Sequence, residues 1–126
     1  MYSPQLLDHF QNPRNAGDVA DADATAEIEN PACGDVLRLT LAIDAGRITK
    51  IGFKAKGCVA SIGCASALTE MVLGKTVAEA RDLGQSRESL ITAVGGLPPA
   101  STHAAQLALD ALSVALKQPP SEGNSA

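Results

Sequence analysis

Two runs of alternating apolar residues, joined by a tight turn, restrict the fold of this chain more than any other feature. In the first run, Val36–Ile43, apolar side chains alternate with polar ones, which is typical of a strand with one buried face. Asp44–Gly46 supplies the turn, and Ile48–Phe53 continues as a second strand. The apolar residues of this second strand change parity, so we expect a bulge or a register change near Gly52. Ala24–Ile28 is compatible with a further strand, and the three segments together predict a three-stranded meander.

Helix signals lie before and after these strands. Each is a capping side chain in front of a helix-forming segment, and they occur at Ser3, Thr76, Ser86 and at Ser101 or Thr102. A further helix is expected after Cys58, with a glycine at its end. We expect His9 to lie on the solvated face of the first helix, opposite Leu6. Glu70 and Glu79 are interpreted as surface or capping charges.

The composition is that of a globular chain without a nucleic-acid or membrane surface. Of the 126 residues, 45% are hydrophobic and 19% are charged, which is enough apolar surface for one ordered domain. The net charge is −4, the basic residues are scattered and aromatic residues are scarce, so neither phosphate-backbone binding nor base stacking is expected. The longest nearly uncharged apolar stretch, Val59–Leu68, is far shorter than the roughly 20 residues of a membrane span. No secretion signal is apparent, so we expect a soluble, cytoplasmic protein.

The three cysteines are the first candidates for a chemical role in this chain. Their odd number, without a secretion signal, favours free thiols or metal ligands over a disulfide framework. Cys33 and Asp35 lie in a loop between two strands, Cys58 lies where a strand passes into a helix, and His103 lies at the start of the last helix. Each of these residues taken alone is more often structural. Together they predict a tetrahedral site of nitrogen, oxygen and sulfur donors for zinc or for one edge of an iron–sulfur cluster.

A set of short motifs occurs in a fixed order along nearly the whole chain. They are Tyr2-Ser3 through Phe10, Asn12-Pro13-Arg14-Asn15, Asn30-Pro31-Ala32-Cys33-Gly34-Asp35, Lys56-Gly57-Cys58, Leu68-Thr69-Glu70, Gly74-Lys75-Thr76, and Leu97-Pro98-Pro99 with His103. In this set and order the chain resembles the IscU/NifU N-terminal family of iron–sulfur cluster scaffold proteins. The resemblance implies an α+β fold with a three-stranded antiparallel sheet covered by about four to five helices. It places the scaffold domain at residues 1–118, and the polar residues 119–126 are expected to form a flexible C-terminal tail.

The resemblance also implies a function in cluster assembly rather than an enzyme activity, so no catalytic residue is assigned. Members of the family build a transient [2Fe-2S] or related cluster from iron and from sulfur that a cysteine desulfurase donates. They pass the cluster to apo acceptor proteins, and zinc often occupies the same ligands. By position, Cys33 and Cys58 correspond to two cysteine ligands, Asp35 to an exchangeable carboxylate ligand, and His103 to the histidine that takes the fourth place.

The chain departs from the family pattern at two places. Where the family has a third cysteine directly after the histidine, this chain has Ala104, which can neither bind a metal nor accept sulfur. The family segment Leu-Pro-Pro-Val-Lys, which Hsp70/J-type chaperones read, is here Leu97–Ser101 and lacks the lysine, which argues against a chaperone partner. Cys64 is interpreted as a small core residue of the predicted helix. Water, a thiolate of another protein or Asp35 is then left to complete the coordination.

Two other functions are alternatives. The first is a divergent paralogue that keeps the fold and a zinc site and acts as a zinc-binding partner or regulator of a cysteine desulfurase, without building clusters. The second is an enzyme in which His103 activates Cys33 or Cys58 as a nucleophile, but no recognisable substrate pocket or nucleophile signature accompanies that pair. We therefore predict a cluster-assembly scaffold first and the zinc-binding paralogue second.

Overall fold

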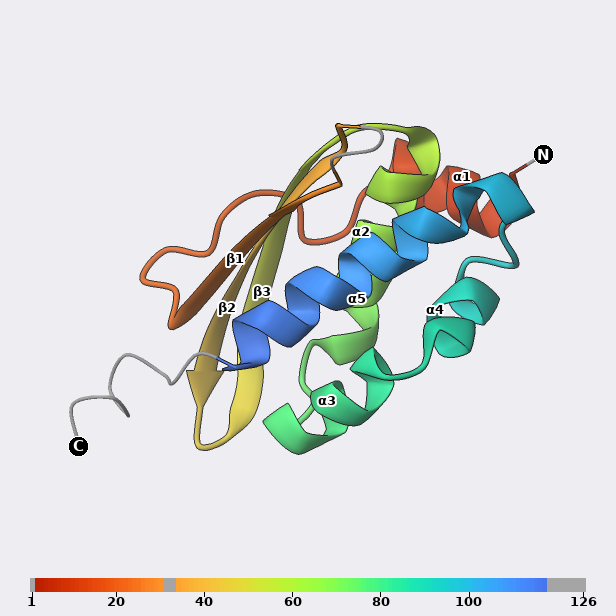
Figure 1. Cartoon of the computed structure of the whole chain (residues 1–126). Helices are drawn as coiled ribbons and strands as arrows, with labels where there is room; N and C mark the ends of the chain where they lie inside the picture. The colour runs from red at the N-terminus through yellow and green to blue at the C-terminus, as the bar shows by residue number, and fades with distance from the viewer. Residues whose placement is uncertain (1, 31–33, 118–126) are drawn as a thin grey trace.

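A three-stranded antiparallel sheet forms one layer of the protein, and helices pack against it to form the other (Figure 1). The computed structural model describes residues 2–30 and 34–117. Strands β1 (Ala24–Glu29), β2 (Val36–Asp44) and β3 (Arg47–Lys56) lie in the order β1-β2-β3. Both neighbouring pairs are antiparallel, so the predicted α+β fold with a three-stranded meander is confirmed.

The hairpin of β2 and β3 contains the predicted irregularity, but at another residue. Ala42 pairs with Lys50, whereas the next residue, Ile43, pairs with Ile48, so that Thr49 is the extra residue of a bulge. The sequence-based position near Gly52 is therefore wrong by a few residues. The bulge restores the parity of β3 and allows the apolar side chains on both sides of it to face the same core.

Five α-helices occur within the described residues. They are α1 (Pro4–Gln11), α2 (Val59–Val72), α3 (Val77–Gly84), α4 (Arg87–Ala93) and α5 (Thr102–Lys117). The predicted capping box at the start of α3 is present: the Thr76 hydroxyl accepts a hydrogen bond from the Glu79 backbone N–H at 3.1 Å, and the Glu79 carboxylate accepts one from the Thr76 N–H at 2.9 Å. A short 3-10 turn (Pro99–Ser101) leads into α5.

Helix α2 is the centre of the helical layer. It packs on β3, while α5 packs on β1 and β2, and α1 and α5 both contact α2. A helix with neighbours on so many sides must be apolar or small on all of them. Gly63 meets this need because an added Cβ would collide with Leu6 of α1. Cys64 is fully buried, and burial raises the pKa of its thiol to about 12, so its interpretation as a core residue is confirmed.

His9 departs from the sequence-based expectation. It is 8% exposed and lies on the same side of α1 as Leu6, against α2, so its predicted place on a solvated face is wrong. The His9 ring nitrogen Nδ1 lies 2.8 Å from the Ser66 hydroxyl oxygen, which also accepts a hydrogen bond from the Arg14 backbone N–H. Burial lowers the pKa of His9 because the charged imidazolium would lose its hydration.

Two parts of the sequence-based description fall outside the described residues. These are residues 31–33, which include the candidate ligand Cys33, and residues 118–126, which include the predicted C-terminal tail. The domain boundary at residue 118 therefore stays a prediction. Within the described segments, no helix combines the length and apolar character that crossing a membrane requires.

Candidate metal centre

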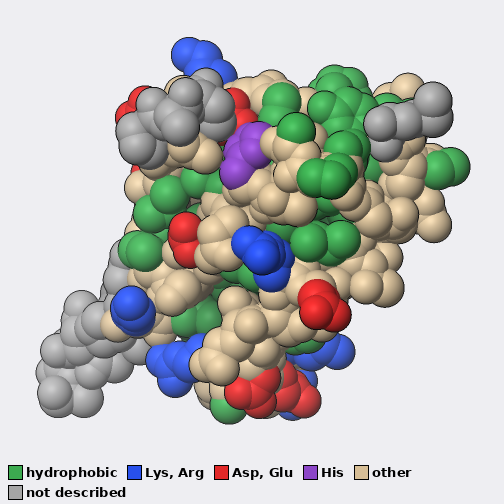
Figure 2. Space-filling view, turned by 45° about the vertical axis from the view of Figure 1, so that its right-hand side comes forward, with side chains coloured by type: hydrophobic (Ala, Val, Ile, Leu, Met, Phe, Trp, Pro, Cys, Tyr) green, Lys and Arg blue, Asp and Glu red, His purple; other side chains and the backbone are tan. Residues whose placement is uncertain are grey.

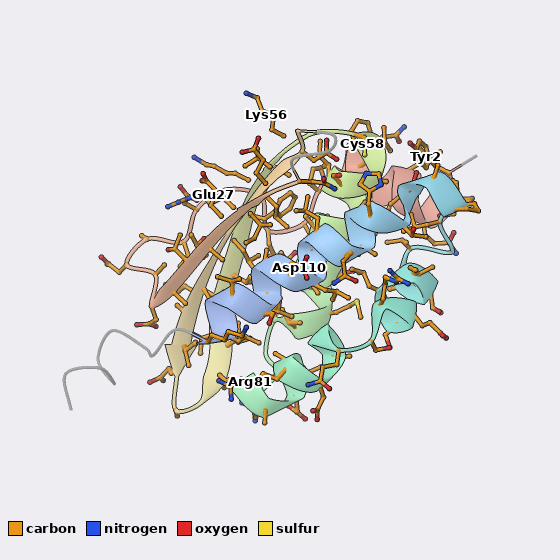
Figure 3. All side chains as sticks on the ribbon, viewed as in Figure 1. Tyr2, Glu27, Lys56, Cys58, Arg81 and Asp110 are labelled. Atoms are coloured by element: carbon orange, nitrogen blue, oxygen red, sulfur yellow. The ribbon has the colours of Figure 1, made fainter. Side chains whose placement is uncertain are left out.

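Three of the four predicted ligands meet at one end of the sheet. Asp35 directly precedes β2, and Cys58 follows β3 by two residues and is the N-cap of α2. Because Val36 pairs with Lys56, the residues just before β2 and just after β3 are held beside each other. Figure 3 shows Cys58 and Lys56 at this end of the molecule, where β3 passes into α2.

The first turn of α5 brings His103 to the same place. One potential ligand atom from each of Asp35, Cys58 and His103 lies within 4.8 Å of the other two. Asp35 Oδ2 is the shared point, at 3.5 Å from Cys58 Sγ and 3.8 Å from His103 Nε2. These separations suit three donors around one small cation after minor side-chain adjustment.

The hydrogen bond of His103 to its own helix start fixes which nitrogen faces the site. His103 Nδ1 lies 3.1 Å from the backbone oxygen of Ala100. A carbonyl oxygen can only accept, so in the neutral ring Nδ1 carries the proton and Nε2 keeps a free lone pair. That lone pair is on the nitrogen that faces Asp35, which is the arrangement a metal-binding histidine requires.

The three donors differ in exposure. The side chain of Asp35 is only 8% exposed, whereas that of His103 is 37% exposed and Cys58 is half-buried. On the face drawn in Figure 2, a histidine side chain reaches the surface with hydrophobic side chains close by. The three donors thus range from a buried carboxylate to a half-buried thiol and an imidazole nearer to solvent.

Gly57 is required by the close approach of two segments. Its φ is +155°, and an added Cβ would lie 2.5 Å from both Cγ and Oδ1 of Asp35. Any larger residue would therefore displace the carboxylate. The glycine directly before Cys58 thus allows the chain that follows β3 to pass close to Asp35 and to place the Cys58 thiol beside it.

Ser61 is a member of this cluster that the sequence analysis missed. Its hydroxyl donates a short hydrogen bond to Asp35 Oδ2, and its oxygen lies 3.3 Å from Cys58 Sγ. The signal was present, since residues three apart on a helix share a face and Ser61 comes three residues after Cys58 at the start of the predicted helix.

The structure describes only some of the remaining candidate residues. Cys33 lies outside the described residues, so its place among the ligands stays a prediction. Ala104 is 1% exposed and offers no donor atom, and Cys64 does not belong to the metal-binding group found among the described residues. The described part of the site therefore supplies one thiol, one carboxylate and one imidazole. Such mixed donors suit borderline or soft divalent metals such as Fe²⁺ and Zn²⁺ better than Mg²⁺ or Ca²⁺.

Comparison with known proteins gives the class to which this fold and site belong. The family model described as "NifU-like N terminal domain" matches residues 1–124. The chain therefore belongs to this family, as its motifs predicted.

Individual relatives agree with this assignment. The chain is 44% identical to the iron-sulfur cluster assembly scaffold protein IscU 1 of Archaeoglobus fulgidus over 112 residues, which are 89% of this chain and 72% of the relative. It is 40% identical over 118 residues to the iron-sulfur cluster assembly scaffold protein IscU of Aquifex aeolicus, covering 92% of this chain and 74% of the relative. A solved structure from Fervidobacterium islandicum AW-1, titled a putative iron-sulfur cluster assembly scaffold protein for the SUF system, superposes with a TM-score of 0.81 at 22% identity, covering 91% of this chain and 96% of that one. At that level of identity the superposition shows a shared fold.

Proposed function

We propose that this protein is a scaffold for iron–sulfur cluster assembly, which receives iron and sulfide, holds a [2Fe-2S] cluster transiently and passes it to acceptor proteins. The observation that carries the proposal is the convergence of Asp35, Cys58 and His103 within 4.8 Å, in a chain whose relatives are named cluster assembly scaffolds. Cys33 is proposed as the fourth ligand because it precedes Asp35 by two residues.

The donor set supports a carrier rather than a permanent cluster site. Thiolates bind iron strongly, whereas a carboxylate and an imidazole are displaced more easily by the thiolates of an acceptor. The site also lies at the surface, with the His103 side chain 37% exposed, so that an incoming ligand has access.

The proposed partners follow from this chemistry. A cysteine desulfurase is proposed as the sulfur source, and apo iron–sulfur proteins are proposed as acceptors, in the cytoplasm. An Hsp70/J-type chaperone is left out of the proposal because the position of the motif lysine is Ser101, which is 9% exposed within the 3-10 turn.

Anaerobic reconstitution tests the function. The full chain is incubated with ferrous iron, sulfide and a thiol reductant, and the visible sulfur-to-iron charge-transfer absorption is recorded together with iron and sulfide content. We expect a coloured product in the unsubstituted protein, and loss of the colour in Cys58→Ala and in Cys33→Ala. A colourless unsubstituted protein that retains no iron would contradict the proposal.

One observation favours a second candidate function. Ala104 is buried and cannot bind a metal, at the position where the resemblance predicts a third cysteine. A protein with this change could keep zinc at Asp35, Cys58 and His103 and bind a cysteine desulfurase as a regulator, without building clusters. Stoichiometric zinc that ferrous iron and sulfide do not replace, together with unchanged desulfurase binding by a cysteine-free variant, would favour this candidate over the scaffold.

A further inference from the structure

Ser61 is a buried polar residue whose hydroxyl contacts two of the candidate metal ligands. It is 3% exposed, and its hydroxyl contacts Asp35 Oδ2 and Cys58 Sγ. The other buried hydroxyls of α2 have different partners. Ser66 accepts a hydrogen bond from the Arg14 backbone N–H, and Thr69 donates to the backbone oxygen of Ser66. These bonds tie α2 to the segment after α1 and to itself, whereas those of Ser61 lie among the candidate ligands.

The Asp35 carboxylate is restrained from two sides. The backbone of Gly57 lies against Oδ1, so closely that a Cβ would be 2.5 Å away, and the Ser61 hydroxyl donates to Oδ2. Rotation of the carboxylate would break the hydrogen bond from Ser61 to Oδ2 inside a buried site, which is costly. The carboxylate is therefore held with Oδ2 toward Cys58 and His103 before any metal arrives.

The same hydrogen bond is compatible with a bound metal. A carboxylate oxygen has two lone pairs, so Oδ2 can accept from Ser61 and still bind a cation. Side chains that bind to metal ligands in this way orient them and limit the entropy lost when the metal binds.

We propose that Ser61 is a positioning residue of the metal centre, whose hydroxyl holds Asp35 Oδ2 toward Cys58 and His103 and so increases the affinity for a divalent metal. This inference rests on the proposed function in one respect, namely that the centre binds a metal. It goes beyond that function because it assigns a role to a residue that provides no ligand atom.

The test uses Co²⁺ as the probe, because its visible spectrum reports on the ligands. Affinity is measured anaerobically by competition with a chelator, on the full chain and at one fixed pH. We expect Ser61→Ala to bind Co²⁺ about tenfold more weakly than the unsubstituted protein, a typical effect of removing a partner of a metal ligand. Its ligand-field spectrum is expected to shift toward that of Asp35→Ala.

Ser66→Ala is the matched control, because it removes the same atom from a buried serine of the same helix that lies away from the metal centre. We expect it to lower the urea midpoint of unfolding and to leave the affinity for Co²⁺ within twofold of the unsubstituted value. Equal weakening by Ser66→Ala would show that looseness of α2, and not the Ser61 hydroxyl, controls binding, and would overturn the inference.

A double-mutant cycle separates positioning of Asp35 from a general structural effect. If Ser61 acts through Asp35, then adding Ser61→Ala to Asp35→Ala changes the affinity for Co²⁺ less than twofold. A full tenfold loss in both backgrounds overturns the inference, as does a Ser61→Ala protein that binds like the unsubstituted one. Failure of the unsubstituted protein to bind Co²⁺ at all would instead contradict the metal centre itself, and with it the proposed function.

Discussion

Replacement of Gly57 by alanine is the most direct perturbation of the metal centre. The new Cβ would lie 2.5 Å from Cγ and Oδ1 of Asp35, a distance that real Cβ atoms do not adopt, and φ at this residue is +155°. A non-glycine residue in such a conformation costs about 1–3 kcal/mol. The collision is relieved when the carboxylate moves, and because the Asp35 side chain is 8% exposed and lies over Cys58, that movement disturbs the ligand set.

We therefore expect Gly57→Ala to reduce the free energy of unfolding by about 1–3 kcal/mol. We also expect it to weaken Zn²⁺ binding about 10- to 100-fold, as when the orientation of a metal ligand is lost. Urea denaturation gives the first quantity, and competition with a chelator gives the second.

Gly46→Ala provides the matched control for the backbone effect. Gly46 has φ +76°, in the turn between β2 and β3, and an added Cβ would meet nothing within 4 Å. Its substitution should cost a similar free energy of unfolding and leave Zn²⁺ affinity unchanged. The reasoning is refuted if Gly57→Ala binds Zn²⁺ as tightly as the unsubstituted protein, or if both variants lose affinity equally.

Three further predictions concern the rest of the fold. The buried thiol of Cys64 has a pKa raised to about 12, so it should resist iodoacetamide at pH 8 in the folded protein and react after urea unfolding. Peptide mass spectrometry measures both reactions. Fast reaction in the folded state would contradict the burial of Cys64. Burial lowers the pKa of His9, so the unfolded state binds the proton more readily than the folded state. The free energy of unfolding should therefore be highest above about pH 6.5 and should fall as the pH is lowered. In His9→Gln, the urea midpoint of unfolding should decline less steeply as the pH falls. Thr76→Ala removes a capping bond of α3 and should cost about 1 kcal/mol in the same assay, whereas an unchanged midpoint would mean that the cap adds nothing.

The helices and strands were predictable because their signals are local. A capping serine or threonine, a turn glycine and an alternating apolar run each act over a few residues, and the elements formed where these signals lay. The bulge was predicted but misplaced for a related reason. The parity change between Ile48 and Ile51 places the extra residue before Gly52, so the glycine was the wrong guide, and strand pairing leaves Thr49 as the extra residue.

His9 was misjudged because polarity was given more weight than spacing. Residues three apart on a helix share a face, so the burial of Leu6 already places His9 toward the core. Its polar atoms are tolerated there because α2 offers Ser66 as a partner for Nδ1. Such a partner comes from a segment more than 50 residues away, and no local pattern of α1 could have revealed it.

The candidate metal centre was predicted from the resemblance, and not from spacing alone. Asp35, Cys58 and His103 are brought together by the pairing of β2 with β3 and by the packing of α5 on the sheet, and both are long-range properties. Ser61 escaped because serine is a common residue at helix starts and carries no metal signal of its own. Its spacing of three residues from Cys58 indicated a shared helix face, but its contact with the Asp35 oxygen that faces the other donors depends on the long-range packing of the fold.

The uneven burial of the donors bears on how a metal or cluster would leave under the proposed function. Asp35 is the most buried of the described donors, with its side chain 8% exposed, the Ser61 hydroxyl on Oδ2 and the Gly57 backbone close to Oδ1. Under the proposed function, an acceptor thiolate would therefore reach the carboxylate less readily than the more exposed donors. Cys58 and His103 are the more exposed of the described donors, and the side chain of His103 is 37% exposed. Under the proposed function, we therefore expect exchange to begin at the more exposed donors rather than at the buried carboxylate.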